Sequence, residues 1–155
     1  MGEKKRIRIT IIAVLLLLVG AFIFYMSSRD VEQSLDNSIP FDRILASIFV
    51  DGYDEMGPDE QYLAALQFDE LSRHAAHITE FAVLGTLLAA ICLLLSVPVW
   101  AGILVGIGYG VFDEVHQIFV NGRGFQVSDI GFDILGVLIG GVLVMVLRKL
   151  RQKGN

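Results

Sequence analysis

The chain has 155 residues, of which 54% are hydrophobic and three are proline, a composition too apolar for a soluble domain of this length. Its formal charge of −5 arises mainly from one segment, because eleven of the seventeen acidic residues lie from Asp30 to Glu70. No basic patch interleaved with aromatic residues points to nucleic acid as a partner. Cys92 is the single cysteine, which excludes an internal disulfide and a cysteine-rich metal site.

Residues 1–6 form a short basic N-terminal segment, and residues 7–26 are apolar apart from Arg8 and Thr10. A helix of that length rises ~1.5 Å per residue and crosses a hydrocarbon core of ~30 Å, so a first transmembrane helix is predicted. A cleaved signal peptide is the alternative, since the basic start fits one. The apolar run exceeds the usual core of a signal peptide and no small-x-small site precedes Ser27, which favours a retained helix.

Residues 27–75 form an acidic loop with a turn-like segment at 51–61. Ser38, ahead of Pro40, predicts a helix start. Five apolar residues then recur at helical spacing: Phe41, Ile44, Leu45, Ile48 and Phe49. This stripe suits a short amphipathic helix on the membrane surface, and packing against the spans explains it equally well. Pro58 predicts a second helix start, from which a helical pattern continues into the membrane.

Three further apolar runs predict membrane spans at residues 76–97, 99–119 and 130–147, so that 76–147 form a three-helix core. A basic tail, 148–155, follows. Eight of the twelve positive charges lie at the two ends of the chain, which share one side of the membrane if there are four spans. The sequence therefore predicts an all-α integral membrane protein, a bundle of four transmembrane helices with both termini cytoplasmic and an extracytoplasmic loop containing short helices.

Polar side chains cluster at the outer ends of the last three predicted spans, where charge is costly and usually functional. On each helix they share one face or adjacent faces. Ten residues belong to this set: Arg73, His77, Glu80, Asp113, Glu114, His116, Gln117, Arg123, Asp129 and Asp133. Glycines extend the third and fourth stripes inward and allow close helix contact: Gly102, Gly106, Gly110, Gly136 and Gly140. Packing of these faces against each other predicts a polar pocket in the outer leaflet.

Several chemistries suit such a pocket. Histidine and carboxylate side chains on facing helices offer ligands for a divalent metal. The candidate metal ligands are His77, Glu80, Asp113 and His116. Alternatively, Arg73 and Arg123 bind a phosphate or carboxylate of a ligand, and neighbouring groups serve as acid and base. The candidates for that catalytic role are Glu80, Asp113, Glu114 and His116. A salt-bridge network that holds the helices together would use the same residues, although it does not require two histidines and so many carboxylates.

The motifs RHAAHITEFAVLG at 73–85, DEVHQIFVNGR at 113–123 and SSR at 27–29, with the Asp129 and Asp133 stripe, resemble the VanZ-like family of bacterial membrane proteins. The resemblance implies a multi-pass protein of the bacterial cell membrane, in a family whose founding member is associated with low-level resistance to teicoplanin. It also implies that the ten polar residues are the family's characteristic positions. His74 stands where lysine is common and Asn121 where proline is common, which puts in question a cation's role at position 74.

Three functions follow as hypotheses. The leading one is a binding or modulating protein that recognises an envelope lipid or a lipid-linked cell-wall precursor in the outer-leaflet pocket. The second is an enzyme that acts on a lipid head group or phosphoester by acid/base or metal-assisted chemistry. The third is a small transporter or flippase, for which four spans are few unless a homo-oligomer supplies the rest. The sequence leaves the ligand, the catalytic activity, the metal content and the role of the acidic loop open.

Overall fold

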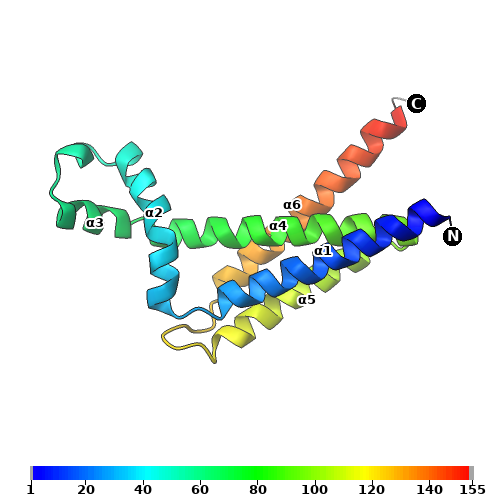
Figure 1. Ribbon diagram of the computed structural model, residues 1–155, viewed down its shortest axis with the longest axis horizontal. Helices are drawn as coiled ribbons and strands as arrows, with labels where there is room; N and C mark the ends of the chain where they lie inside the picture. Colours follow the sequence, from blue (N-terminus) through cyan, green and yellow to red (C-terminus); the bar gives the residue numbers. More distant parts are fainter. Residues whose placement is uncertain (1, 154–155) are drawn as a thin grey trace.

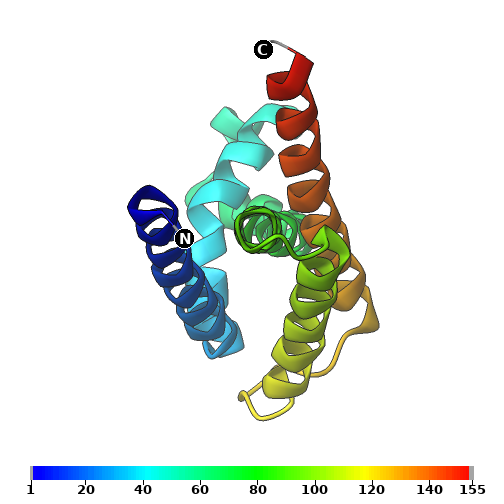
Figure 2. The same cartoon turned by 90° about the vertical axis from the view of Figure 1, so that its right-hand side faces the viewer.

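The computed structural model describes residues 2–153, which are helical and contain no strand; Met1, Gly154 and Asn155, at the ends of the predicted N-terminal segment and basic tail, lie outside this range. The elements are α1 (Glu3–Ser27), α2 (Val31–Phe49), η1 (Tyr53–Glu55), α3 (Pro58–Leu66), α4 (Asp69–Leu95), α5 (Val99–Gln117) and α6 (Val127–Lys153). Helix α4 packs against α1, α5 and α6, and its contact with α6 is the most extensive (Figures 1 and 2). Helices α2 and α3 lie at the end of the bundle away from the two termini (Figure 1).

Three helices of the described chain are long and apolar enough to cross a membrane: α1, α4 and α6. These helices coincide with three of the four predicted spans, as expected of a membrane protein. Helix α5 is continuous over 19 residues and packs on α4 and α6, but it is not among the three. Its last turns carry Asp113, Glu114, His116 and Gln117, so the same polar residues that mark the site reduce its apolar character.

The helices extend beyond the predicted spans because backbone hydrogen bonds continue where the apolar sequence ends. Helix α4 begins at Asp69 rather than near residue 76, and α6 covers Val127–Lys153 rather than 130–147. Helix α5 is shorter than predicted and ends at Gln117. These shifts place the polar residues of α4 and α6 inside regular helix, which fixes the direction of each side chain.

The helix start predicted at Ser38 is wrong. Helix α2 begins at Val31, where the Asp30 side chain accepts a hydrogen bond of 2.8 Å from the Gln33 N–H and caps the helix. Pro40 therefore lies inside the helix, a position that costs about 3 kcal/mol in isolation. Packing of the buried face of α2 on α3 and α4 offsets that cost.

The predicted start at Pro58 is confirmed, and Glu60 accepts a hydrogen bond from the Gly57 N–H. The helix does not run unbroken into the membrane, because α3 ends at Leu66 and α4 begins at Asp69. Phe68, in the break, packs on a small apolar cluster from three elements: Ala46, Tyr53, Ala64 and Ala65. The acidic loop is thus a folded cap with a core of its own.

The apolar stripe of α2 faces outward. Phe41, Ile44, Ile48 and Phe49 are 50–69% exposed, whereas Asp42 and Ala46 are buried. Packing against the spans therefore does not explain Ile44, Ile48 and Phe49, whereas Phe41 lines a cavity between α2 and the spans. Their exposure at one end of the bundle fits the surface helix that the sequence predicts.

Glycines allow α6 to lie directly against α4. A Cβ atom at Gly136 would come within 2.5 Å of the Ile78 carbonyl oxygen, and one at Gly140 would clash with the Ala82 carbonyl oxygen. Helix α5 also uses its stripe, since a Cβ atom at Gly110 would lie 2.9 Å from Asp133 Oδ2. The predicted glycine seam is confirmed. It brings the polar ends of α4, α5 and α6 together.

Candidate functional site

The polar site lies at the end of the bundle away from the termini, where the C-terminal ends of α1 and α5 meet the first turns of α4 and α6. Five of its side chains are almost completely buried, with exposures of 0–1%: Asp113, Glu114, Gln117, Asp129 and Asp133. His77 is 7% exposed. Four carboxyl groups and an imidazole are therefore removed from solvent in one small volume.

His77 on α4 connects to both aspartates of α6. Its Nδ1 atom lies 2.8 Å from Asp133 Oδ1, within hydrogen-bond distance, and its Nε2 atom lies 3.9 Å from Asp129 Oδ2. The spacing of Asp129 and Asp133, one helical turn apart, places both on the face of α6 that contacts α4. The short Nδ1 contact fixes the orientation of the ring, and Nε2 remains without a hydrogen bond.

His74 lies beside the same aspartate. Its Nε2 atom is 3.4 Å from Asp129 Oδ1, and its ring stacks on Phe132 with centroids 4.1 Å apart. An imidazole, which becomes a cation when protonated, therefore occupies this position against Asp129.

The acidic end of α5 is held by three donors, two of which come from other parts of the chain. Ser27, at the end of α1, donates a hydrogen bond of 2.7 Å to Asp113 Oδ2. Gln117 donates from Nε2 to Asp113 at 3.2 Å and to Glu114 at 3.0 Å. The backbone N–H of Gln126 donates to Glu114 Oε2 at 2.8 Å. Both carboxyl groups of α5 are thus oriented, although Asp113 Oδ1 is buried without a hydrogen-bond partner.

Three side chains offer ligand atoms that lie within 4.8 Å of one another: His77, Asp113 and Glu114. This is not the set that the sequence predicted, because Glu80 and His116 are outside it. His116 Nε2 lies 3.0 Å from Ser28 Oγ instead, and its ring stacks on Phe24. Helix rotation explains the difference, since Glu114 lies on the α4 side of α5 and His116 on the α1 side.

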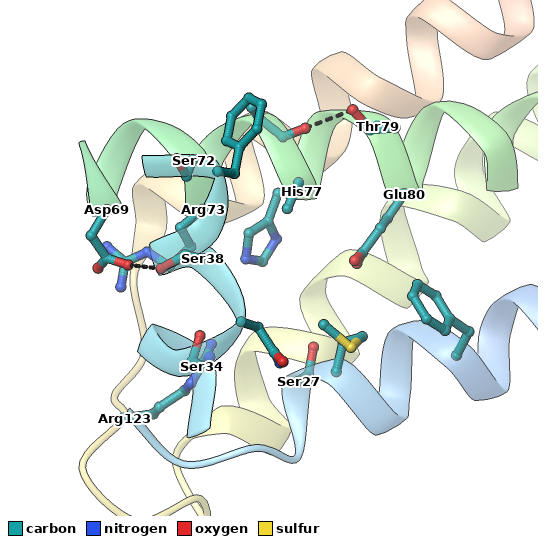
Figure 3. Close-up of a pocket in the computed structure, with 16 residues that line it drawn as sticks. Ser27, Ser34, Ser38, Asp69, Ser72, Arg73, His77, Thr79, Glu80 and Arg123 are labelled. Atoms are coloured by element: carbon teal, nitrogen blue, oxygen red, sulfur yellow. Dashed lines mark hydrogen bonds between the residues drawn. The ribbon is translucent and has the colours of Figure 1, made fainter. Parts of the chain in front are cut away.

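A cavity of about 510 Å³ opens beside this cluster between α1, α2 and α4 (Figure 3). His77 and Glu80 point into it from α4, and Ser27 faces them from α1 (Figure 3). Its polar walls also include Arg73 and Arg123, and its apolar walls include side chains of α1 and α2: Phe22, Met26 and Phe41. The cavity therefore combines two guanidinium groups with an apolar surface.

The two arginines approach the cavity from different parts of the chain. Arg73 lies in the first turns of α4, and Arg123 lies in the loop between α5 and α6. Burial lowers the pKa of Arg123 from its ordinary value, and repulsion from the positive charge of Arg73 lowers it further. Neither guanidinium is within ion-pair distance of a carboxylate in residues 2–153. Arg73 Nε is buried and has no hydrogen-bond partner there.

Sequence reasoning missed several residues that shape the site. The sequence marks Ser27 only as part of a motif, yet its hydroxyl donates a hydrogen bond directly to Asp113. Asp42 of α2 is fully buried and accepts a hydrogen bond from Ser72, and Ser38 donates to Asp69 at 2.7 Å. These contacts fasten the cap helix α2 over α4. Their partners are 30 residues or more apart in sequence, so no local pattern signals them.

In a comparison with protein families, the chain matches the VanZ/LLP1 family model over residues 12–148. No curated protein and no solved structure matches the chain. The matched residues include the second half of α1, the cap, α4, α5 and most of α6, and therefore the whole polar site. The chain therefore belongs to the VanZ/LLP1 family of membrane proteins.

Proposed function

We propose that this protein binds a phosphate-bearing amphiphile of the cell envelope, a membrane lipid or a lipid-linked cell-wall precursor, in the cavity between α1, α2 and α4. The observation that carries the proposal is the pair Arg73 and Arg123, which line one cavity without an ion-pair partner in residues 2–153. Two adjacent guanidinium groups repel each other, and an anion between them removes that cost. Arginine binds phosphate through two parallel hydrogen bonds, which favours this anion.

The remaining walls suit the rest of an amphiphile. Ser34, Asn37 and Ser38 on α2 supply hydroxyl and amide groups near the arginines. Phe22 and Met26 of α1 and Phe41 of α2 supply apolar surface on the side of the membrane helix. A head group contacts the first set while its lipid chain lies along α1 and the exposed stripe of α2.

We also propose that the cavity opens on the outer side of the membrane. Eight of the twelve basic residues lie at the two termini, and such residues concentrate on the cytoplasmic side. Both termini share one side if α5 crosses the membrane as the fourth span. The site, at the opposite end of the bundle, then faces the outer leaflet of a bacterial plasma membrane.

Lipid binding tests the proposal directly. The purified protein is incubated with phosphatidylglycerol, a polyprenyl phosphate or phosphatidylcholine, and retained lipid is measured by native mass spectrometry. We expect Arg73→Gln and Arg123→Gln each to reduce retention of the anionic lipids by at least about tenfold, the loss expected for a phosphate–arginine contact. Arg43→Gln is the matched control, because Arg43 is exposed on α2 and does not line the cavity.

Equal retention by all three variants would contradict the proposal. In cells, Arg73→Gln should also change susceptibility to teicoplanin if the ligand is a lipid-linked wall precursor. A susceptibility change without a loss of phosphatidylglycerol binding would identify the precursor, rather than bulk lipid, as the ligand.

A second candidate function is an enzyme that acts on the head group or phosphoester of the same ligand. The observation that favours it is the buried group of His77, Asp113 and Glu114, of which His77 lines the cavity; such a group can hold or move a proton. Release of phosphate or head group by the purified protein, lost in Glu114→Gln, supports the enzyme. Binding without release in both proteins supports recognition alone.

A further inference from the structure

We propose that His77, Asp113 and Glu114 form a binding site for a divalent transition-metal cation such as Zn²⁺ or Mn²⁺. Their ligand atoms lie within 4.8 Å of one another and all three residues are buried. Ligands bound to one cation at ~2.0–2.2 Å lie ~3–4 Å apart, so side-chain movements of about 1 Å bring these atoms to coordination distance.

The imidazole is oriented as a metal ligand. In many metal sites a carboxylate accepts a hydrogen bond from one ring nitrogen and leaves the other free for the metal. His77 has this arrangement, because its Nδ1 atom lies 2.8 Å from Asp133 Oδ1. Its Nε2 atom makes no hydrogen bond in residues 2–153, and Asp129 Oδ2 lies 3.9 Å from it. Asp133 therefore acts as a positioning residue for His77.

The carboxylate ligands are also held in place before any metal binds. The Gln126 N–H fixes Glu114 at 2.8 Å, and Gln117 donates to both Glu114 and Asp113. These contacts leave Asp113 Oδ1 buried without a hydrogen-bond partner. A buried carboxylate oxygen with no partner is costly, and a cation at this point removes the cost.

The charge balance of the cluster requires compensation. Four carboxyl groups are buried together, and no lysine or arginine of the described chain lies within ion-pair distance of them. Asp129 Oδ2 and Asp133 Oδ2 are, like Asp113 Oδ1, without hydrogen-bond partners. A dication provides two positive charges at the centre of the group. Protonation of several carboxyl groups is the other way to neutralise the cluster, and the experiment separates the two.

The donor set indicates the class of metal. One imidazole nitrogen with two carboxylates suits zinc, manganese or ferrous iron, whereas calcium and magnesium prefer oxygen ligands alone. His77 also lines the cavity, so the cation would keep an open coordination position on that side.

The experiment measures metal bound per chain. The protein in detergent is stripped with a chelator, dialysed against Zn²⁺ or Mn²⁺ in an excess of Mg²⁺, and analysed for bound metal by mass spectrometry. We expect about one transition-metal ion per chain and a melting temperature that rises with metal concentration. His77→Asn and Glu114→Gln should each weaken binding at least tenfold.

Two matched controls replace the same types of residue, a histidine and a carboxylate, at positions outside the proposed metal site. His116→Asn removes a histidine of α5 that lies outside the group, and Asp69→Asn removes a carboxylate at the cavity wall. Both should keep the metal. Glu114→Gln still accepts from the Gln126 N–H through its amide oxygen, so its metal-free melting temperature reports whether it folds.

A wild-type protein that binds no metal in stoichiometric amount overturns the proposal, as does equal loss in the controls. The metal site does not depend on the lipid function. Arg73→Gln and Arg123→Gln should still bind the metal although they lose anionic lipid. His77→Asn should lose the metal, and if it still binds lipid, the two sites are separate.

Discussion

The two ends of the helix bundle both carry many ionisable side chains, but these are buried at one end and exposed to solvent at the other. At the end near α2, four carboxyl groups are buried. Two of them, on Asp113 and Glu114, accept hydrogen bonds from Ser27, Gln117 and Gln126, and Asp133 lies 2.8 Å from His77. At the end with the termini, a hollow of about 740 Å³ lies between α1, α4 and α6. Its charged residues are exposed arginines: Arg8, Arg148 and Arg151.

The difference lies in the cost of each arrangement. An exposed arginine is solvated and needs no specific partner, so it contributes little to stability. A buried carboxylate must be compensated by specific partners, so its geometry is fixed and its replacement is expensive. Burial with fixed partners, rather than charge density, distinguishes the end that carries the candidate site.

The largest loss of stability is expected when the helices that support the buried carboxyl groups are forced apart. Gly136→Leu places a side chain where the Ile78 carbonyl oxygen lies 2.5 Å from a Cβ atom, so we expect a loss of about 3 kcal/mol or failure to fold. Accumulation in membranes and thermal unfolding in detergent measure this. Gly131→Leu, on the same helix with nothing within 4 Å of its Cβ, should have little effect. Equal effects of the two would contradict the packing of α6 on α4.

A smaller effect is expected when one partner is removed from the buried end. His77→Leu leaves Asp133 without its hydrogen bond and the carboxyl cluster without its imidazole, which should cost about 3 kcal/mol in thermal unfolding. His116→Leu removes a ring that contacts Ser28 and Phe24 near the surface, and should cost about 1 kcal/mol or less. A larger loss in His116→Leu would mean that burial does not separate the two histidines.

The smallest effect is expected at the basic end. Arg148→Gln combined with Arg151→Gln removes two exposed charges and should change the free energy of unfolding by less than about 0.5 kcal/mol, with bound metal unchanged. Lys149→Gln with Lys153→Gln provides the comparison, because these lysines do not line the hollow. A large loss only in the arginine pair would show that the basic end also depends on specific partners.

Much of this architecture was accessible from local sequence patterns. The first, second and fourth spans follow from long apolar runs, and the glycine seam follows from four-residue spacing on α5 and α6. The cap was less accessible. Pro40 and Ser38 suggested a helix start that the Asp30 cap and the packing of α2 override, and the end of α3 at Leu66 depends on a cluster drawn from three elements.

The sequence by itself determined that the chain is a helical membrane protein of the VanZ/LLP1 family with polar residues at the ends of its spans, because length, hydropathy and helical spacing are local properties. Only the tertiary structure decided how those residues are grouped. Glu114 joins His77 and Asp113, while His116 turns to Ser28 and Glu80 faces the cavity. The rotation of each helix about its own axis makes that division, and it is set by the glycine contacts between helices, which no single helix encodes.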